Sequence, residues 1–350
     1  MRISEPTLLI NKSKVEKNID KMIGRAKKCD TIFRPHFKTH QSIAIGEVFR
    51  EKGVDKITVS SVAMAEFFAE AGWGDITIAF PLNLAELDKI YALAKKINLN
   101  ILVDSLYSIN FLSKYITHSL GVFIKIDIGY HRCGLDFDNE DIMKIIDTIN
   151  KHKHLFFCGF LGHAGQNYNA RGKHEIEQNV LRAIEQFEDL RKKFPGALIS
   201  WGDTPSCSIS ENLGYFDELR PGNFVYYDVM QYHIGSCDME EIAVTVLCPV
   251  VSVNVSRSEL VIYGGSVHLS KEFIAADNNF KLFGYVTRFE NNKCGKPLPG
   301  TYVSSLSQEH GIIKMPQELI RTFNPGDIIG ILPIHSCLSA NLLKNNMIIR

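Results

Sequence analysis

One lysine, Lys38, lies in a stretch of the sequence with few residues that would keep its amine solvated. The stretch reads IFRPHFKTHQ (residues 32–41) and continues a short apolar run that begins at Thr31. An amine that is partly removed from water and lies near imidazole groups has a lowered pKa, so it becomes a usable nucleophile. Most loop lysines are simply solvated, but these neighbours make Lys38 a candidate for forming a Schiff base with an aldehyde cofactor.

Pyridoxal phosphate, an aldehyde cofactor of this kind, also needs a phosphate cradle, a ring stack and partners for its ring nitrogen and phenolic oxygen. Backbone N–H groups and a hydroxyl for the phosphate are available at Gly202 to Thr204 and at Gly222-Asn223. Arg132, in a loop flanked by glycines, could donate to the phenolic oxygen, and His163 could lie against the ring. Taken singly, these residues are also compatible with ordinary turns, a surface arginine and a core histidine.

A second group with possible chemistry lies near the C-terminal end of the sequence. His335 and Cys337 follow the strand-like run IIGILPI and offer an imidazole and a thiolate one residue apart. Two ligands are too few for a closed structural zinc site, but a metal with open positions can admit a substrate. Zinc is borderline-soft and suits a pair that contains cysteine, whereas a carboxylate would favour a harder ion such as manganese.

Short apolar runs alternate with amphipathic segments between about residue 31 and residue 229. Eight runs are predicted to be strands: 31–33, 56–60, 75–79, 100–103, 122–127, 156–161, 197–201 and 224–227. They are continuously apolar, as in parallel strands that are covered on both faces. The segments between them have apolar residues at helical spacing. Eight strand–helix units predict a parallel (β/α)8 TIM barrel, whereas a doubly wound open sheet, the alternative, usually has fewer units.

The candidate residues lie at one rim of this predicted barrel. Lys38 follows the first strand, Arg132 the fifth, His163 the sixth and Thr204 the seventh, while Gly222 and Asn223 come directly before the predicted eighth. Active sites of such barrels form at the carboxyl ends of the strands and in the loops that follow. The shared position, more than any single residue, indicates a functional site.

After Met230 the sequence changes to strand-like runs that are separated by turn signals, with little helical periodicity. These runs lie at 241–255, 258–267, 280–289, 300–307 and 326–334. They predict a second, C-terminal all-β domain over residues 231–350, which residues 1–10 join through the strand-like run PTLLI. The barrel domain then spans residues 11–230, and the β-domain contains His335 and Cys337.

The composition argues against several classes of protein. Hydrophobic residues make up 45% and charged residues 22% of the 350 residues, which is ordinary for a soluble globular protein. Lys+Arg and Asp+Glu both number 39, so no net charge favours nucleic acid or an anionic membrane. The eight cysteines include no CxxC pair, and the N-terminus lacks the apolar core of a signal peptide. We therefore expect a cytoplasmic protein with reduced thiols and no membrane span.

Seven motifs in one order carry a resemblance to a known family: PHFKTH, DIGYHRCG, GHAGQNY, DTPS, LRPGNFVYYD, SQEHG and HSC. The chain resembles the fold-type III pyridoxal phosphate enzymes, which have an alanine racemase N-terminal-like barrel. Within them it is most similar to the branch of D-serine dehydratase and D-threonine aldolase. The resemblance covers nearly the whole chain. One departure is Asp203, an acidic residue within the expected phosphate cradle.

The resemblance implies a role for each candidate residue. Lys38 would hold the cofactor and take the α-proton of the substrate, and Arg132 would contact the phenolic oxygen. His163 would stack on the ring and Tyr168 would face the ring nitrogen. Thr204, Gly222 and Asn223 would bind the phosphate, and His335 with Cys337 would hold a divalent metal, zinc by the softness of the thiolate.

The implied activity is that of a lyase acting on a D-β-hydroxy amino acid, with the metal as a Lewis acid on the β-hydroxyl. Loss of water and then ammonia would convert D-serine to pyruvate. The alternative on the same scaffold is retro-aldol cleavage to glycine and an aldehyde, as in D-threonine aldolase. An amino-acid racemase would need no metal, and a pyridoxal phosphate homeostasis protein would usually have only the barrel. We expect a homodimer that completes each site.

Overall fold

The computed structural model describes residues 2–170, 172–276 and 280–350. The chain divides into two compact units. We call Asp20–Lys38 and Ser42–Gly222 the barrel unit, and Met1–Ile19, Thr39–Gln41 and Asn223–Arg350 the β-rich unit. Each unit is described separately below.

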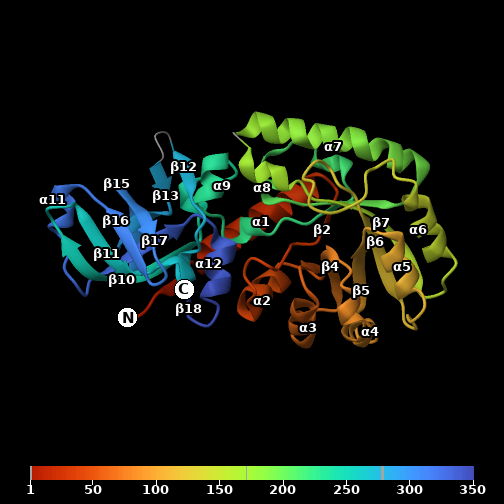
Figure 1. Cartoon of the computed structure of the whole chain (residues 1–350), viewed down its shortest axis with the longest axis horizontal. Coiled ribbons are helices and arrows are strands. Elements are labelled where there is room, and N and C mark those ends of the chain that lie inside the picture. Colours follow the sequence, from red (N-terminus) through yellow and green to blue (C-terminus); the bar gives the residue numbers. More distant parts are fainter. Residues whose placement is uncertain (1, 171, 277–279) are drawn as a thin grey trace. The chain divides into compact units, whose positions relative to one another are not determined.

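The barrel unit is built on an eight-stranded parallel sheet in the order β2-β9-β8-β7-β6-β5-β4-β3. Figure 1 labels β2 and β4 to β7 of this sheet. Its strands are β2 (Ile32–Phe33), β3 (Ile57–Val59), β4 (Asp75–Pro81), β5 (Asn98–Val103), β6 (Leu120–Lys125), β7 (Leu155–Gly162), β8 (Leu198–Trp201) and β9 (Glu218–Leu219). The end of β2 also joins β3, because the Phe37 N–H donates to the Thr58 carbonyl at 2.8 Å and the Thr58 N–H to the Pro35 carbonyl at 2.9 Å. This pairing closes the sheet into a barrel, which confirms the predicted fold class.

The predicted eighth strand was placed wrongly. The structure has strand β9 at Glu218–Leu219, whereas Asn223–Val225, in the predicted run 224–227, forms the short 3-10 helix η4. The Arg34 N–H donates to the Leu219 carbonyl at 2.9 Å, which pairs this two-residue strand with the chain after β2. A short apolar run reports burial rather than backbone conformation, and residues 224–227 are indeed buried. As a consequence, Gly222 and Asn223 follow the last barrel strand instead of preceding it.

Helices alternate with the barrel strands. They are α1 (Lys12–Lys28), α2 (Ile43–Glu51), α3 (Val62–Glu70), α4 (Leu87–Ala94), α5 (Leu106–Leu112), α6 (Asp141–Asn150), α7 (Lys173–Lys193) and α8 (Thr204–Ile209), with the 3-10 turns η1 (Leu84–Glu86), η2 (Gly165–Asn169) and η3 (Leu213–Tyr215). Several begin at serine caps: the hydroxyls of Ser42, Ser61 and Ser105 accept the N–H three residues later. The apolar stripe of α7 is buried at Ile176, Val180 and Phe187.

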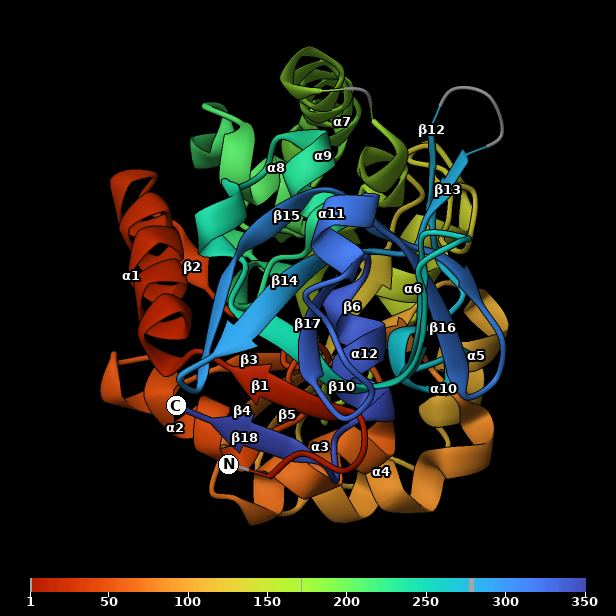
Figure 2. The ribbon, with the colours of Figure 1, turned by 90° about the vertical axis from the view of Figure 1, so that its left-hand side faces the viewer.

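The β-rich unit contains a second eight-stranded sheet, in the order β11-β16-β15-β14-β17-β10-β1-β18 (Figure 2). Its strands are β1 (Thr7–Ile10), β10 (Val244–Asn254), β11 (Glu259–Tyr263), β14 (Gly284–Glu290), β15 (Lys293–Leu306), β16 (His310–Lys314), β17 (Ile328–Pro333) and β18 (Met347–Ile349). The pairing of β10 with β11 closes part of this sheet into a ring. As the run PTLLI predicted, β1 joins the sheet, pairing antiparallel with β10.

Smaller elements complete the β-rich unit. Strands β12 (Ile274–Ala276) and β13 (Phe280–Leu282) pair with each other. The short helices are η4, α9 (Val229–Ile234), η5 (Met239–Glu241), α10 (Ser266–Leu269), α11 (Gln317–Ile320) and α12 (Ser336–Leu342), and α10 packs against α12. No helix in the described ranges of either unit is long and apolar enough to cross a membrane.

Candidate active site

Lys38 lies in a turn just after β2, at the carboxyl end of the barrel strands. The turn is anchored by the buried Phe37, whose ring lies 5.0 Å from each of the rings of Phe49, Phe68 and Trp73. The backbone N–H of Lys38 donates to His36 Nδ1 at 3.3 Å. Because Phe37 is held on three sides, the backbone next to it is fixed, and Lys38 itself is half-buried.

Arg132 lies in the loop after β6, which Asp127 shapes from within. One Asp127 oxygen accepts the N–H groups of Gly129 and His131, both at 3.0 Å. Partial burial would raise the pKa of Asp127, but these hydrogen bonds outweigh it and lower the pKa. Gly134 closes the loop with φ +116°, and a Cβ there would meet the Asp127 nitrogen at 2.7 Å, so only glycine fits. The hydrogen bonds of Asp127 and the turn at Gly134 therefore restrict the conformation of the loop that contains Arg132.

His163 follows β7 and is the centre of the predicted cofactor residues in the barrel unit. Its Nδ1–H donates to the Gly202 carbonyl at 2.5 Å, and the Tyr168 ring lies 6.4 Å away at an angle of 44°. Burial lowers its pKa well below the ordinary value, and the charges of Lys38 and Arg132 lower it further. The ring is therefore a neutral imidazole, suited to stacking on an aromatic ring. Lys38, Arg132 and Tyr168 therefore all lie near enough to His163 to interact with its ring.

Thr204 is the first residue of α8, and the acidic Asp203 before it has a structural role. Asp203 caps the helix: it accepts the Ser206 N–H at 2.7 Å and the Ser206 hydroxyl at 2.6 Å. A third bond comes from the Asn167 amide at 3.2 Å. The carboxylate thus turns into the protein, which explains how an acidic residue fits beside Thr204. Burial nevertheless raises its pKa to about 6.

Sequence reasoning missed Arg220, which follows β9. This guanidinium is only 4% exposed and donates to the Ser200 hydroxyl at 2.5 Å and to the Gly162 carbonyl at 2.7 Å. It therefore ties together the ends of β7, β8 and β9. Burial lowers its pKa to about 10, and Glu218 counteracts this. A Cβ on Gly202 would meet the Arg220 carbonyl at 2.8 Å, so the predicted phosphate turn needs glycine there.

A second missed residue is Lys125, the last residue of β6. Its side chain is almost fully buried, and Nζ donates to the Ile126 carbonyl at 2.6 Å. Burial lowers its pKa to about 8, and the nearby Arg220 and Arg132 lower it as well. The sequence signal for Lys125 is the apolar run that precedes it in LGVFIK. All six residues of this strand are buried in the structure.

His335 and Cys337 come together in the β-rich unit, where α12 begins after β17. Nδ1 of His335 lies 2.7 Å from a Glu272 carboxylate oxygen. Burial lowers the pKa of His335, but the Cys337 thiolate, the Glu272 hydrogen bond and Asp228 raise it to about 11 overall. A site that attracts a proton so strongly is electrostatically suited to a metal cation. The described residues contain no cluster of three or more His, Cys, Asp or Glu side chains that could hold a metal ion.

Cys337 is surrounded by polar groups of the same unit. The Thr39 hydroxyl lies 3.2 Å from its sulfur, and the Asn223 amide donates to it at 3.4 Å. The same amide donates to Asp228 at 2.6 Å. The side-chain amide of Asn223 is therefore engaged with the thiol and with Asp228. A contact between Asn223 and a phosphate would then have to be made by the backbone N–H of this residue. Thr39 directly follows Lys38 in the sequence.

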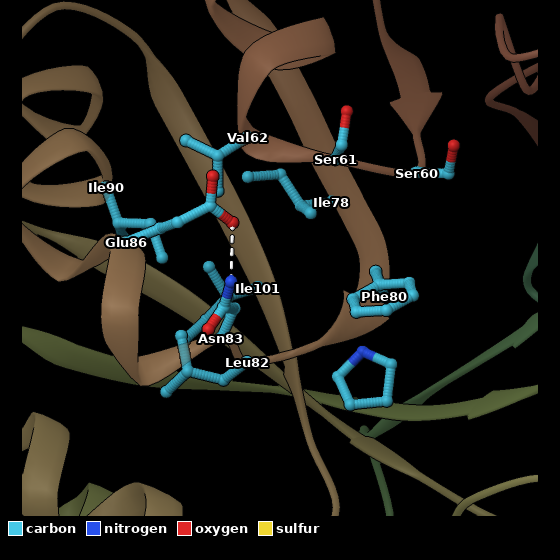
Figure 3. A pocket seen from close by; sticks show the side chains of 11 residues that line it. Ser60, Ser61, Val62, Ile78, Phe80, Leu82, Asn83, Glu86, Ile90 and Ile101 are labelled. Atoms are coloured by element: carbon cyan, nitrogen blue, oxygen red, sulfur yellow. Dashed lines mark hydrogen bonds between the residues drawn. The ribbon is translucent and has the colours of Figure 1, made fainter.

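The barrel unit also has a cavity of about 320 Å³ that no motif predicted (Figure 3). It lies at the ends of β3 and β4 and is mostly apolar, with Val62, Ile78 and Ile101 in its wall. At one side the Asn83 amide donates to Glu86 at 2.9 Å. None of the predicted site residues is in its described lining.

Comparison with known families agrees with the division of the fold into a barrel and a β-rich part. Residues 10–229 match the family described as alanine racemase, N-terminal domain. The chain belongs to this family. Residues 243–349 match a serine dehydratase domain. Together the two matches cover both the barrel and the β-rich C-terminal part, so the predicted resemblance is confirmed.

Individual relatives match over nearly the whole chain. The D-serine dehydratase of Dictyostelium discoideum is 30% identical, over 99% of this chain and 93% of its own length. The D-threo-3-hydroxyaspartate dehydratase of Delftia sp. (strain HT23) is 26% identical, over 96% of this chain and 92% of its own. A crystal structure of a D-threo-3-hydroxyaspartate dehydratase mutant in the metal-free form is 25% identical, with a TM-score of 0.88, over 97% of this chain and 93% of that one.

Proposed function

We propose that this family member is a pyridoxal phosphate- and zinc-dependent lyase that converts a D-β-hydroxy amino acid to a keto acid and ammonia. We propose D-serine as the substrate, with pyruvate and ammonia as the products. One observation carries the proposal: the chain combines a lysine-bearing barrel with a His–Cys pair and is 30% identical, over 99% of its length, to a protein named D-serine dehydratase.

The residues of the barrel unit fit the cofactor. Pyridoxal phosphate, when bound, supplies an electron sink for the charge that develops at the α-carbon of the substrate. Lys38 binds the cofactor aldehyde and takes the α-proton. Arg132 donates to the phenolic oxygen. The neutral His163 would lie against the ring, and Tyr168 would face the ring nitrogen.

Three residues are assigned to the phosphate: Thr204, Gly222 and Asn223. The close approach of Gly202 to Arg220 supports a tight turn beside Thr204, where backbone N–H groups can face an anion. A phenol such as that of Tyr168 would not keep the pyridine nitrogen protonated as a carboxylate would. The electron sink is then weaker, so assistance at the leaving hydroxyl becomes more valuable.

His335 and Cys337 fit a divalent metal that provides this assistance. Their imidazole and thiol lie within hydrogen-bonding reach of each other, and the surrounding carboxylates favour a cation. The two protein ligands hold the ion and leave other positions open for a substrate oxygen. Zinc, as a Lewis acid, supplies stabilisation of the negative charge on the leaving oxygen. The soft thiolate favours zinc over harder ions.

A product assay tests the function directly. The holoenzyme is incubated with D-serine, D-threonine and D-3-hydroxyaspartate, with L-serine as the stereochemical control. We expect keto acid and ammonia from at least one D-isomer and nothing from L-serine. Glycine with an aldehyde would instead establish retro-aldol cleavage, and interconversion of D- and L-isomers would establish racemisation. Each of these two results would replace the dehydratase assignment.

We also propose a homodimer in the cytoplasm, with a barrel domain over residues 11–230 and a β-domain over residues 231–350 plus 1–10. The balanced charge gives the chain no general attraction to anionic surfaces, and none of the eight cysteines forms a disulfide in the described part of the chain, as expected in a reducing compartment. Sedimentation of the active enzyme tests the assembly, since a fully active monomer would contradict it.

A further inference from the structure

Glu272 makes a direct contact with one of the predicted metal ligands, although no motif pointed to it. Its carboxylate oxygen Oε2 lies 2.7 Å from Nδ1 of His335, across 63 residues of sequence. The two side chains are 44% and 26% exposed. Ion pairs with this much exposure contribute little to folding. Stability alone therefore gives little reason for the pair.

The local structure holds Glu272 in place. Helix α10 packs against α12, the helix that begins directly after His335. The chain leaves α10 through Ser270, whose φ of +69° lies in the left-handed region that non-glycine residues rarely adopt. The Ser270 hydroxyl then accepts the backbone N–H of Glu272 at 3.3 Å. On the other side, the Phe273 ring contacts the Phe283 ring at 5.5 Å. The carboxylate is thus carried by a backbone constrained on both sides.

A carboxylate at Nδ1 has a specific consequence for an imidazole that binds metal. With the Nδ1 hydrogen directed at the carboxylate, the tautomer is set, and Nε2 keeps the lone pair that a metal needs. The negative charge also makes the imidazole a stronger donor, and such carboxylate–histidine–metal arrangements are common. We propose that Glu272 is a positioning residue that orients His335 and raises the metal affinity of the His335–Cys337 pair. This inference rests on the proposed function, because it assumes that the pair binds metal.

Metal affinity, measured without substrate, tests the inference. Zinc dissociation constants are determined by chelator competition for the wild type, Glu272→Gln, Glu272→Ala, His335→Ala and a control, Glu259→Gln. Glu259 is a carboxylate of the same unit whose ion-pair partners are Lys314 and Arg257. We expect Glu272→Ala to weaken zinc binding by about 10–100-fold. Glu272→Gln keeps an acceptor without the charge, so its loss is smaller. The control should bind as the wild type does.

Substitution with cobalt(II) gives a second readout that does not depend on turnover. The visible ligand-field absorption of the bound ion reports the geometry of its ligands, so it should shift in Glu272→Ala and stay unchanged in Glu259→Gln. Equal zinc affinity and equal spectra for the wild type and Glu272→Ala, with binding lost in His335→Ala, would overturn this inference alone. A wild type that binds no metal would overturn the metal role in the proposed function and this inference with it.

Discussion

Positive charge gathers around His163 in the barrel unit. Lys38, Arg132 and Arg220 all lower its pKa, and Lys125 lies near the same two arginines. Placing several cations together and away from water is unfavourable unless an anion joins them. The phosphate and the phenolic oxygen of pyridoxal phosphate are anions of the required kind. The positive charges around His163 therefore favour an anion at this site in addition to Glu218, whose charge already acts on Arg220.

The first prediction concerns the binding of the cofactor by Lys38. The purified wild type should absorb near the visible edge because Lys38 holds the cofactor, and Lys38→Ala should lose this band together with turnover. Lys52→Ala, which changes a surface lysine paired with Asp20, is the control. An unchanged spectrum in Lys38→Ala would refute the assignment.

Lys125 should make stability depend on pH. Its pKa is about 8 in the folded protein and about 10.5 when unfolded, so between these values the unfolded chain binds more protons. The free energy of unfolding contributed by this group therefore rises with pH across that window and is lowest below pH 8. The full difference is about 3 kcal/mol. Urea unfolding at pH 7 and pH 10 measures it.

The matched comparison uses Lys125→Met. The free energy of unfolding of this variant, relative to that of the wild type, should be higher at pH 7 than at pH 10. The reason is that the variant lacks an amine whose protonation in the folded state is unfavourable. Lys89→Met, at a surface lysine, should show no such trend. A pH-independent difference between Lys125→Met and the wild type would contradict the assignment.

At the scale of elements, the loops after the barrel strands are fixed by hydrogen bonds as well as by packing. Asp127 organises the loop after β6, Asp203 caps α8 after β8, and Arg220 ties three strand ends together. Asp203 and Arg220 pair with backbone groups in buried surroundings, whereas the hydrogen bonds of Asp127 order an exposed loop. Such loops can present a cofactor site with little rearrangement on binding.

The cap of α8 gives a prediction at this scale. Asp203→Ala leaves the Ser206 N–H, the Ser206 hydroxyl and the Asn167 amide without their acceptor. We expect the free energy of unfolding to fall by about 1–3 kcal/mol. Cofactor affinity, measured by titrating pyridoxal phosphate into the apoenzyme, should fall too, because Thr204 is the next residue.

Ser105→Ala removes a cap of α5 that has no predicted cofactor residue beside it. It should lower stability by about 1 kcal/mol and leave cofactor affinity unchanged. If both caps affected the cofactor equally, the special role of Asp203 beside Thr204 would be wrong.

At the scale of the whole molecule, the two halves of the proposed chemistry belong to different compact units. The barrel unit contains Lys38 and the residues assigned to the cofactor ring, and the β-rich unit contains His335 and Cys337. If the lyase reaction needs both, the two should be separable by experiment. A metal chelator should abolish turnover while the absorption band of the bound cofactor remains.

Adding zinc back should restore turnover in the wild type but not in His335→Ala. Incubation in buffer without chelator is the control for slow inactivation. Full activity in a strong chelator would remove the metal from the mechanism and leave the cofactor assignment standing.

Much of the fold could be predicted from the sequence. Helical and strand periodicities are local, so the barrel, the β-rich region and the strand formed by PTLLI were all predicted correctly. The prediction failed at 224–227, where an apolar run turned out to be a buried 3-10 turn, and at β9, whose two residues are too few to show any period. In so short a run, the pattern of apolar residues indicates burial but does not distinguish a strand from a helical turn.

The residue types at the strand ends were enough to assign the family and to nominate Lys38, His163, His335 and Cys337. Arg220, Lys125 and Glu272 emerged only from the folded chain. Their importance comes from desolvation and from hydrogen bonds to residues far away in sequence, such as Gly162 for Arg220 and His335 for Glu272. Neither property has a local pattern, because both are created when distant segments meet.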